Sequence, residues 1–152
     1  MNQLLTIVRS LPISSCAALL LSVATVRPAV SYVKTSGDDT LSGASWAQAK
    51  RSITNAMAAA GAGDQIWVAS GIYTQLVTVN ADVALYGGFN GTETALAQRN
   101  WTTNISWIYG ASMGTAVTIN GGGPDTRVDG MVITGGAGLF GGGILKMLHP
   151  EG

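Results

Sequence analysis

Two carboxylates and a guanidinium lie close together in the segment GGGPDTRVDG, where Asp125, Arg127 and Asp129 alternate with single residues. If this segment is extended, alternate side chains point to one side, so Arg127 and Asp129 share a face and Asp125 can follow. Two carboxylates about 5 to 9 Å apart can act as acid and base in glycoside cleavage. The alternative is structural, because Pro124-Asp125 and Asp129-Gly130 are turn-forming pairs and Arg127 is then a surface partner. The turns explain all of these residues, so this alternative is preferred.

Metal and phosphate chemistry have little support. Asp38 and Asp39 could offer oxygens to Ca²⁺, which takes 6 to 8 oxygen ligands, but their spacing matches no calcium loop and a solvated turn is expected. His149 is the single histidine, which excludes a histidine-based triad or zinc site. The glycine runs lack the Lys-Ser/Thr of a phosphate loop. We therefore predict neither a metal nor a cofactor.

Aromatic side chains are the other resource for binding. Aromatic faces stack on sugar rings, so a row of them on one sheet would form a carbohydrate-binding surface. The alternative for each ring is packing in the core. The stacking candidates are Trp67, Tyr73, Tyr86, Trp101, Trp107 and Tyr109.

Composition favours one turn-rich β domain. Of the 152 residues, 11% are charged and 47% hydrophobic, and 21 are glycine. Eight basic and eight acidic residues give a formal net charge of zero. Because no Lys/Arg cluster occurs, nucleic acid is not expected as a partner.

The N-terminal segment has the pattern of a signal peptide over residues 1–31. Arg9 precedes an apolar stretch at 16–26, and small residues at 29–31 suit a signal peptidase. The apolar stretch is shorter than the roughly 20 residues that span a bilayer, so no transmembrane segment is predicted beyond the signal peptide. Its removal leaves six basic and eight acidic residues, a net charge of −2, and no cysteine, because Cys16 is the only one. A lipoprotein signal at Cys16 is disfavoured, because the best apolar run follows the cysteine instead of preceding it.

One amphipathic helix is predicted over residues 46–60. Trp46, Ile53 and Met57, together with several alanines, recur at spacings of three and four and mark one apolar face. Ser45 and Gln48 fit a capping box at its start. A helix with a single apolar stripe must lie on another apolar surface.

Short strands dominate the rest of the chain. They are predicted at 32–35, 66–69, 76–79, 83–86, 105–108, 116–119 and 131–134, and several end in glycine. Gly87, Gly110 and Gly135 recur at intervals of 23 and 25 residues, which favours a coiled solenoid of parallel sheets over the alternative, a β-sandwich. Glycines at the corners allow positive φ there. The predicted corner glycines are Gly71, Gly87, Gly88, Gly110, Gly121, Gly122, Gly135 and Gly136.

Three blocks carry a family resemblance: YVKTSGDDTLSGASWAQAKRSITNAMAAAGAGDQIWVASGIYT, ALYGGFNGTETALAQRNW and GMVITGGAGLFGGGI. Together they resemble the start of bacterial right-handed parallel β-helix proteins of the pectin-lyase-like fold, including surface proteins related to the polymorphic outer-membrane proteins. The resemblance covers roughly residues 32–144. It implies an all-β solenoid, a right-handed parallel β-helix, whose N-terminal end the helix caps.

The sequence thus predicts a signal peptide at 1–31, the cap and first coils of a solenoid at 32–144, and an irregular tail at 145–152 where the chain is cut short. The expected function is an exported extracellular or cell-surface module with a structural, adhesive or carbohydrate-binding role, the partner being a polysaccharide or cell-surface ligand. The alternative is a polysaccharide lyase or glycoside hydrolase of the same fold, since such a fold hosts both.

Overall fold

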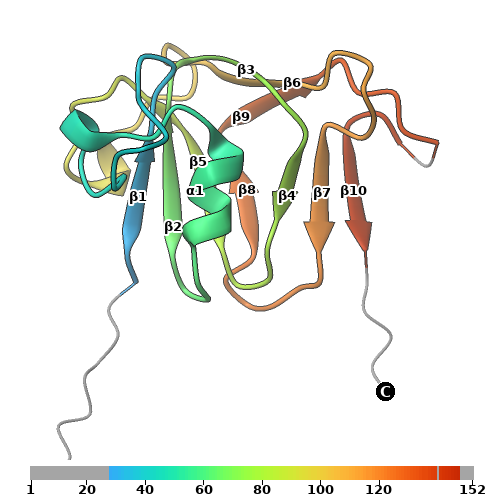
Figure 1. Cartoon of the computed structure of the whole chain (residues 1–152), viewed down its shortest axis with the longest axis horizontal. Helices are drawn as coiled ribbons and strands as arrows, with labels where there is room; N and C mark the ends of the chain where they lie inside the picture. The colour runs from blue at the N-terminus through green and yellow to red at the C-terminus, as the bar shows by residue number, and fades with distance from the viewer. Residues whose placement is uncertain (1–27, 140, 148–152) are drawn as a thin grey trace, which may run out of the picture.

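The computed structural model describes residues 28–139 and 141–147 (Figure 1). In these residues short strands alternate with loops, and the helical elements all lie before residue 99. The elements are β1 (Val30–Val33), η1 (Trp46–Gln48), α1 (Ile53–Ala59), β2 (Gln65–Ala69), β3 (Gly71–Thr74), β4 (Val77–Val79), β5 (Ala84–Phe89), η2 (Leu96–Gln98), β6 (Ser106–Tyr109), β7 (Val117–Asn120), β8 (Arg127–Asp129), β9 (Met131–Thr134) and β10 (Ile144–Met147).

The strands form three small sheets with the orders β1-β2-β5-β8, β10-β7-β4 and β3-β6-β9. Every pair of neighbouring strands is parallel. The strands β2, β3 and β4 belong to three different sheets. The strands β5 to β7, and then β8 to β10, enter the same three sheets in the same order. Because parallel neighbours cannot be joined by a tight hairpin, the chain must travel away before each return. The predicted parallel pairing is confirmed, and the alternative of an antiparallel sandwich is wrong.

The predicted fold class is nevertheless wrong. We expected an all-β, right-handed parallel β-helix with the helix as a cap on one end. The structure is mixed instead: three small parallel sheets share the core with α1, and the described residues show no closed solenoid. The side chains of Ile53, Ala56 and Met57 on α1 are buried in the same apolar cluster as β-strand residues such as Val33 and Val79. The helix is therefore part of the core, which strand spacing and glycine positions could not indicate.

The predicted helix over 46–60 is divided into two elements. Ser45 does cap, since its hydroxyl accepts a hydrogen bond from the Gln48 backbone N–H at 3.3 Å, but it caps η1. The side chain of Gln48 accepts from Ser42 Oγ, so the capping box is not formed. The helix α1 begins after Ser52, whose hydroxyl accepts from the Asn55 backbone N–H at 3.2 Å.

The division follows from two separate apolar clusters. Trp46 on η1 packs near Tyr32 and Phe89, with ring centroids 4.8 and 5.7 Å away. Ile53 and Met57 on α1 instead enter the main core. One straight helix could not place its side chains in both clusters, so the chain runs extended between the two elements.

Three strands were not predicted, and two predicted boundaries fall within strands. The unpredicted strands are β3, β8 and β10. The expected irregular tail from residue 145 contains strand residues up to Met147, because β10 pairs with β7. At the other end β1 begins at Val30, so the expected signal-peptide boundary at 31 falls inside a strand. Residues 1–27 and 148–152, including Cys16 and His149, lie outside the described residues.

Gly87 and Gly88 were predicted to form a corner after a strand ending at residue 86. This prediction is wrong, because both glycines lie inside β5, which continues to Phe89. Gly88 has φ of +96°, and the register between β2 and β5 shifts at this point, which marks a bulge. A Cβ on Gly88 would lie 2.9 Å from the Trp101 backbone nitrogen. The remaining predicted corner glycines lie at or just beyond strand ends: Gly71, Gly110, Gly121, Gly122, Gly135 and Gly136.

A second cluster of aromatic rings covers the outer side of the β1-β2-β5-β8 sheet. The rings of Trp67 and Phe89 stack with centroids 4.7 Å apart. Trp46 on η1 connects the segment between β1 and α1 to the loop after β5, because its indole N–H donates to the Glu93 carbonyl at 2.8 Å. The Glu93 carboxylate is itself buried and accepts backbone hydrogen bonds from Asn90, Gly91 and Thr92. These contacts hold the loop over the sheet.

Candidate functional site

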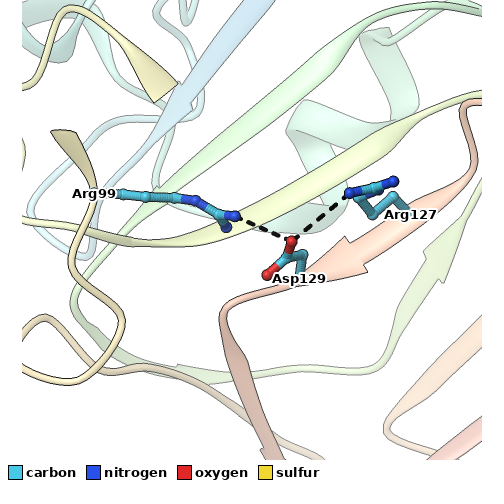
Figure 2. Close-up of polar contacts among 3 residues, drawn as sticks. All are labelled: Arg99, Arg127 and Asp129. Atoms are coloured by element: carbon cyan, nitrogen blue, oxygen red, sulfur yellow. Dashed lines mark hydrogen bonds and ion pairs between the residues drawn. The ribbon is translucent and has the colours of Figure 1, made fainter. Parts of the chain in front are cut away.

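Asp129, one of the charged residues selected from the sequence, forms an ion pair with Arg99, which was not selected. Asp129 lies on β8 beside Tyr86 of β5. Its Oδ2 atom is 3.0 Å from Nη2 of Arg99 and 4.0 Å from Nη1 of Arg127 (Figure 2). The side chain of Arg99 is 12% exposed and that of Arg127 is 61% exposed. The closer, less exposed pair is therefore the one that matters for structure.

Arg99 also contacts two aromatic rings. Its guanidinium carbon is 4.9 Å from the centroid of Tyr86 and 5.0 Å from that of Trp101. Its Nη1 atom is buried and has no hydrogen-bond partner among the described residues. Arg99 thus joins the loop after η2 to β5 and β8. No spacing rule pointed to Arg99, because Tyr86 and Asp129 lie on strands far from it along the chain.

Asp125 does not join this cluster. It lies in the turn before β8, is exposed, and its backbone N–H donates to Asp82 Oδ1 at 3.4 Å. It lines a hollow of about 280 Å³ together with Tyr86 and Arg127, to which Asp129 does not contribute. The structure therefore does not place the two carboxylates in one hollow, as an acid–base pair would require. The turn interpretation of Pro124-Asp125 is confirmed.

Asp38 and Asp39 use their oxygens within the fold. Hydrogen bonds from the backbone and hydroxyl of Thr40 lower the pKa of Asp38 below its ordinary value. Partial burial opposes ionisation of Asp39, but hydrogen bonds from Ser52, Asn55 and Arg51 outweigh it and lower the pKa of Asp39. Among the described residues no cluster of three or more possible metal ligands occurs.

Three of the six candidate rings are buried and cannot stack on a ligand in this structure. Trp67 is 5% exposed, Tyr73 3% and Tyr86 9%. The hydroxyl of Tyr73 donates to the Ala69 carbonyl at 3.0 Å, and burial raises the pKa of Tyr73 above its ordinary value. These three rings pack inside the protein, which is the alternative to sugar stacking that was stated for each ring.

The other three rings are exposed, and two of them share one strand. Trp101 lies in a loop and is 54% exposed. Trp107 and Tyr109, on β6, are 37% and 41% exposed. Between them Ile108 is fully buried, so the two rings point to the same, outer side of the sheet.

Neighbouring strands extend this surface. In the parallel register Trp107 lies between Ile72 of β3 and Val132 of β9. In the same register Tyr109 lies between Thr74 of β3 and Thr134 of β9. All six side chains are exposed, and none is charged. We call this surface the β6 face; it comprises Ile72, Thr74, Trp107, Tyr109, Val132 and Thr134.

A hollow of about 410 Å³ adjoins the β3 edge of the β6 face. It shares Ile72 and Thr74 with that face, and two further lining residues belong to β3 and the position after it. The rest come from the segment between β1 and α1 and from the start of α1. The lining residues are Thr35, Arg51, Ser52, Thr54, Ile72, Tyr73, Thr74 and Gln75. The exposed face thus leads into a hollow whose lining residues mostly carry a hydroxyl or amide group.

The comparisons identify no relative. No protein-family model, curated protein or solved structure matches the chain. The resemblance to bacterial surface proteins of the pectin-lyase-like fold therefore stays a prediction. Within the described part of the chain no helix has the length and apolar character needed to cross a membrane.

Proposed function

We propose that this protein is an exported module of the cell surface or extracellular space that binds carbohydrate on the β6 face. The observation that supports this most is the pair Trp107 and Tyr109, exposed at alternate positions of one strand. Pyranose rings present flat C–H faces and equatorial hydroxyls. Aromatic rings with a polar tip offer apolar area to the first and hydrogen bonds to the second.

The setting of the two rings supports a binding role. A row of large apolar side chains across three strands is an uncommon use of solvent-facing positions and typically marks an interaction site. Ile72 is 65% exposed and Val132 37% exposed on either side of Trp107. The backbone beneath them is held by pairing on both sides of β6, so the rings are presented on a rigid support.

Export rests on the signal-peptide pattern at residues 1–31. The strand β1 begins at Val30, and cleavage after Ser31 would leave Tyr32 and Val33 to pair with β2. N-terminal sequencing of the secreted protein tests this part of the proposal. Recovery of the uncleaved chain from the cytoplasm alone would contradict it.

Affinity electrophoresis tests the binding function. The full chain is run through gels containing xylan, glucomannan, mixed-linkage glucan, polygalacturonate or alginate. We expect at least one polysaccharide to retard the protein, and the double variant Trp107→Ala/Tyr109→Ala to migrate as in a gel without polysaccharide. The matched control is Trp101→Ala, which removes an exposed ring that lies outside the β6 face. Migration unchanged by every polysaccharide would contradict the proposal.

A further inference from the structure

Building on the proposed function, we propose that the ligand is an uncharged polysaccharide that crosses β9, β6 and β3 and enters the hollow at the β3 edge. The register of three strands defines the path of the ligand over the protein, and the charges around the hollow define its chemical class.

The register defines two parallel rows on the β6 face. One row is apolar and consists of Val132, Trp107 and Ile72. Since neighbouring strands lie about 4.8 Å apart, this row extends about 10 Å across the sheet, enough for two sugar rings. A chain of sugar rings that crosses the strands can therefore keep its C–H faces on apolar side chains throughout.

The second row carries hydroxyls. Thr134, Tyr109 and Thr74 occupy one register line, two residues further along each strand. This places the Cα atoms of the second row about 7 Å from those of the apolar row, along one side of a chain that crosses the strands. Each hydroxyl can donate and accept, which suits the hydroxyl groups of a sugar. The two rows together match a ligand with flat apolar faces and polar edges.

The hollow continues both rows beyond β3. Ile72 and Thr74 belong to the β6 face and to the lining of the hollow. Past them the lining is supplied by hydroxyl and amide groups, including Thr35, Thr54 and Gln75. A sugar leaving the apolar row therefore meets hydrogen-bonding groups in a concave site, where more of its surface is removed from water.

The charges favour an uncharged ligand over an acidic one. The one cation in the lining is Arg51, whose Nε donates to the Gly37 carbonyl at 3.0 Å. Its backbone N–H donates to Asp39, and its charge acts on the neighbouring Asp38. Asp38 and Asp39 do not line the hollow, but both lie close enough to Arg51 to offset its charge. A polyanion gains little from such a balance, whereas an uncharged glycan is indifferent to it.

Isothermal titration of the full chain tests the inference with two sets of probes. Cellohexaose, xylohexaose and mannohexaose are uncharged, and oligogalacturonate and oligomannuronate are acidic. We expect binding of an uncharged probe, abolished or weakened at least about tenfold by Trp107→Ala. Its affinity should be the same in low and high NaCl, because salt screens only interactions between charges.

Threonine-to-valine variants test the path. Valine keeps the shape and strand propensity of threonine and removes the hydroxyl. Loss of one hydrogen bond in Thr74→Val or Thr134→Val should weaken binding about threefold to tenfold. The matched control is Thr78→Val, an exposed threonine on β4 in another sheet, which should leave the affinity unchanged.

The outcomes separate this inference from the proposed function. Trp107-dependent binding of acidic probes alone overturns the inference and leaves the carbohydrate-binding function in place. Binding of an uncharged probe that neither Thr74→Val nor Thr134→Val weakens overturns the path. If no probe and no polysaccharide binds, or if the β6 face instead mediates self-association that Trp107→Ala abolishes, both proposals fall.

Discussion

Nη2 of Arg99 lies 3.0 Å from Oδ2 of Asp129, and this ion pair connects the loop after η2 to β8. The same guanidinium contacts the rings of Tyr86 and Trp101. A charged group with 12% of its side chain exposed gains from such contacts both Coulomb attraction and packing of its long aliphatic stem. The interaction therefore links the loop after η2 to Asp129 of β8 and to Tyr86, which belongs to the second buried cluster.

Arg99→Ala should lower the free energy of unfolding by about 2 kcal/mol, because it removes a charge-assisted hydrogen bond together with two ring contacts. Urea unfolding followed by tryptophan fluorescence measures this. Arg127→Ala is the control and should change stability by less than about 0.5 kcal/mol, since Arg127 is 61% exposed and 4.0 Å from Asp129. Equal losses in the two variants would show that the Arg99 contact has no special weight.

Asp129→Asn separates stability from binding. This substitution weakens the ion pair on the β1-β2-β5-β8 sheet, whereas the proposed ligand lies on the β3-β6-β9 sheet. We expect a loss of about 1 kcal/mol in unfolding free energy and no change in affinity for polysaccharide. Loss of binding in a variant that keeps its circular dichroism spectrum would move the site to Asp129.

Gly88 and Gly91 offer a matched pair of backbone tests. Their φ angles are +96° and +99°, but a Cβ on Gly88 would lie 2.9 Å from the Trp101 nitrogen, whereas one on Gly91 would meet nothing within 4 Å. Gly91→Ala should cost about 1 kcal/mol of stability through backbone strain alone. Gly88→Ala should cost about 1 to 3 kcal/mol more, because the added methyl group also collides with backbone. Thermal or urea unfolding that gives the two variants equal stability would contradict the close approach.

Asp39 should make the protein less stable in acid. Its carboxylate accepts hydrogen bonds from the Arg51 and Ser52 backbone and from the Ser52 hydroxyl, and its folded-state pKa is lowered from 3.8. A lowered folded-state pKa stabilises the fold above the unfolded pKa, and this contribution is lost as the pH falls through the folded value. Asp39→Ala should therefore be less stable than the unchanged chain at neutral pH. The difference should shrink below about pH 4. A difference in stability independent of pH would rule out this role of the carboxylate.

Local patterns in the sequence predicted most strand positions but not how the strands and helix share the core. All seven predicted strands overlap observed ones, namely β1, β2, β4, β5, β6, β7 and β9, because β-branched and aromatic runs bounded by glycine are local signals. The helix was placed too early and made too long, since periodicity grouped Trp46 with Ile53 although they serve different clusters. Whether three parallel sheets close into a solenoid depends on long-range geometry, and the predicted class was wrong.

The candidate site was predicted in part. Trp107 and Tyr109 were among the selected rings, but so were Trp67 and Tyr73, which are buried. Composition cannot distinguish these cases, because which side a ring faces depends on where its strand begins and on what lies over the sheet. Ile72 was missed because its strand was not predicted. Arg99 was missed because two of its partners, Tyr86 and Asp129, are 13 and 30 residues away along the chain.

The most direct test of carbohydrate binding on the β6 face is a fluorescence titration of single tryptophan variants. The chain has four tryptophans, of which Trp101 and Trp107 are the most exposed. The titrant is the polysaccharide that retards the protein in the affinity gel. We predict that it changes the emission of the unchanged chain and of Trp101→Phe, and that the change is absent in Trp107→Phe. A change that persists in Trp107→Phe and disappears in Trp101→Phe would contradict the account.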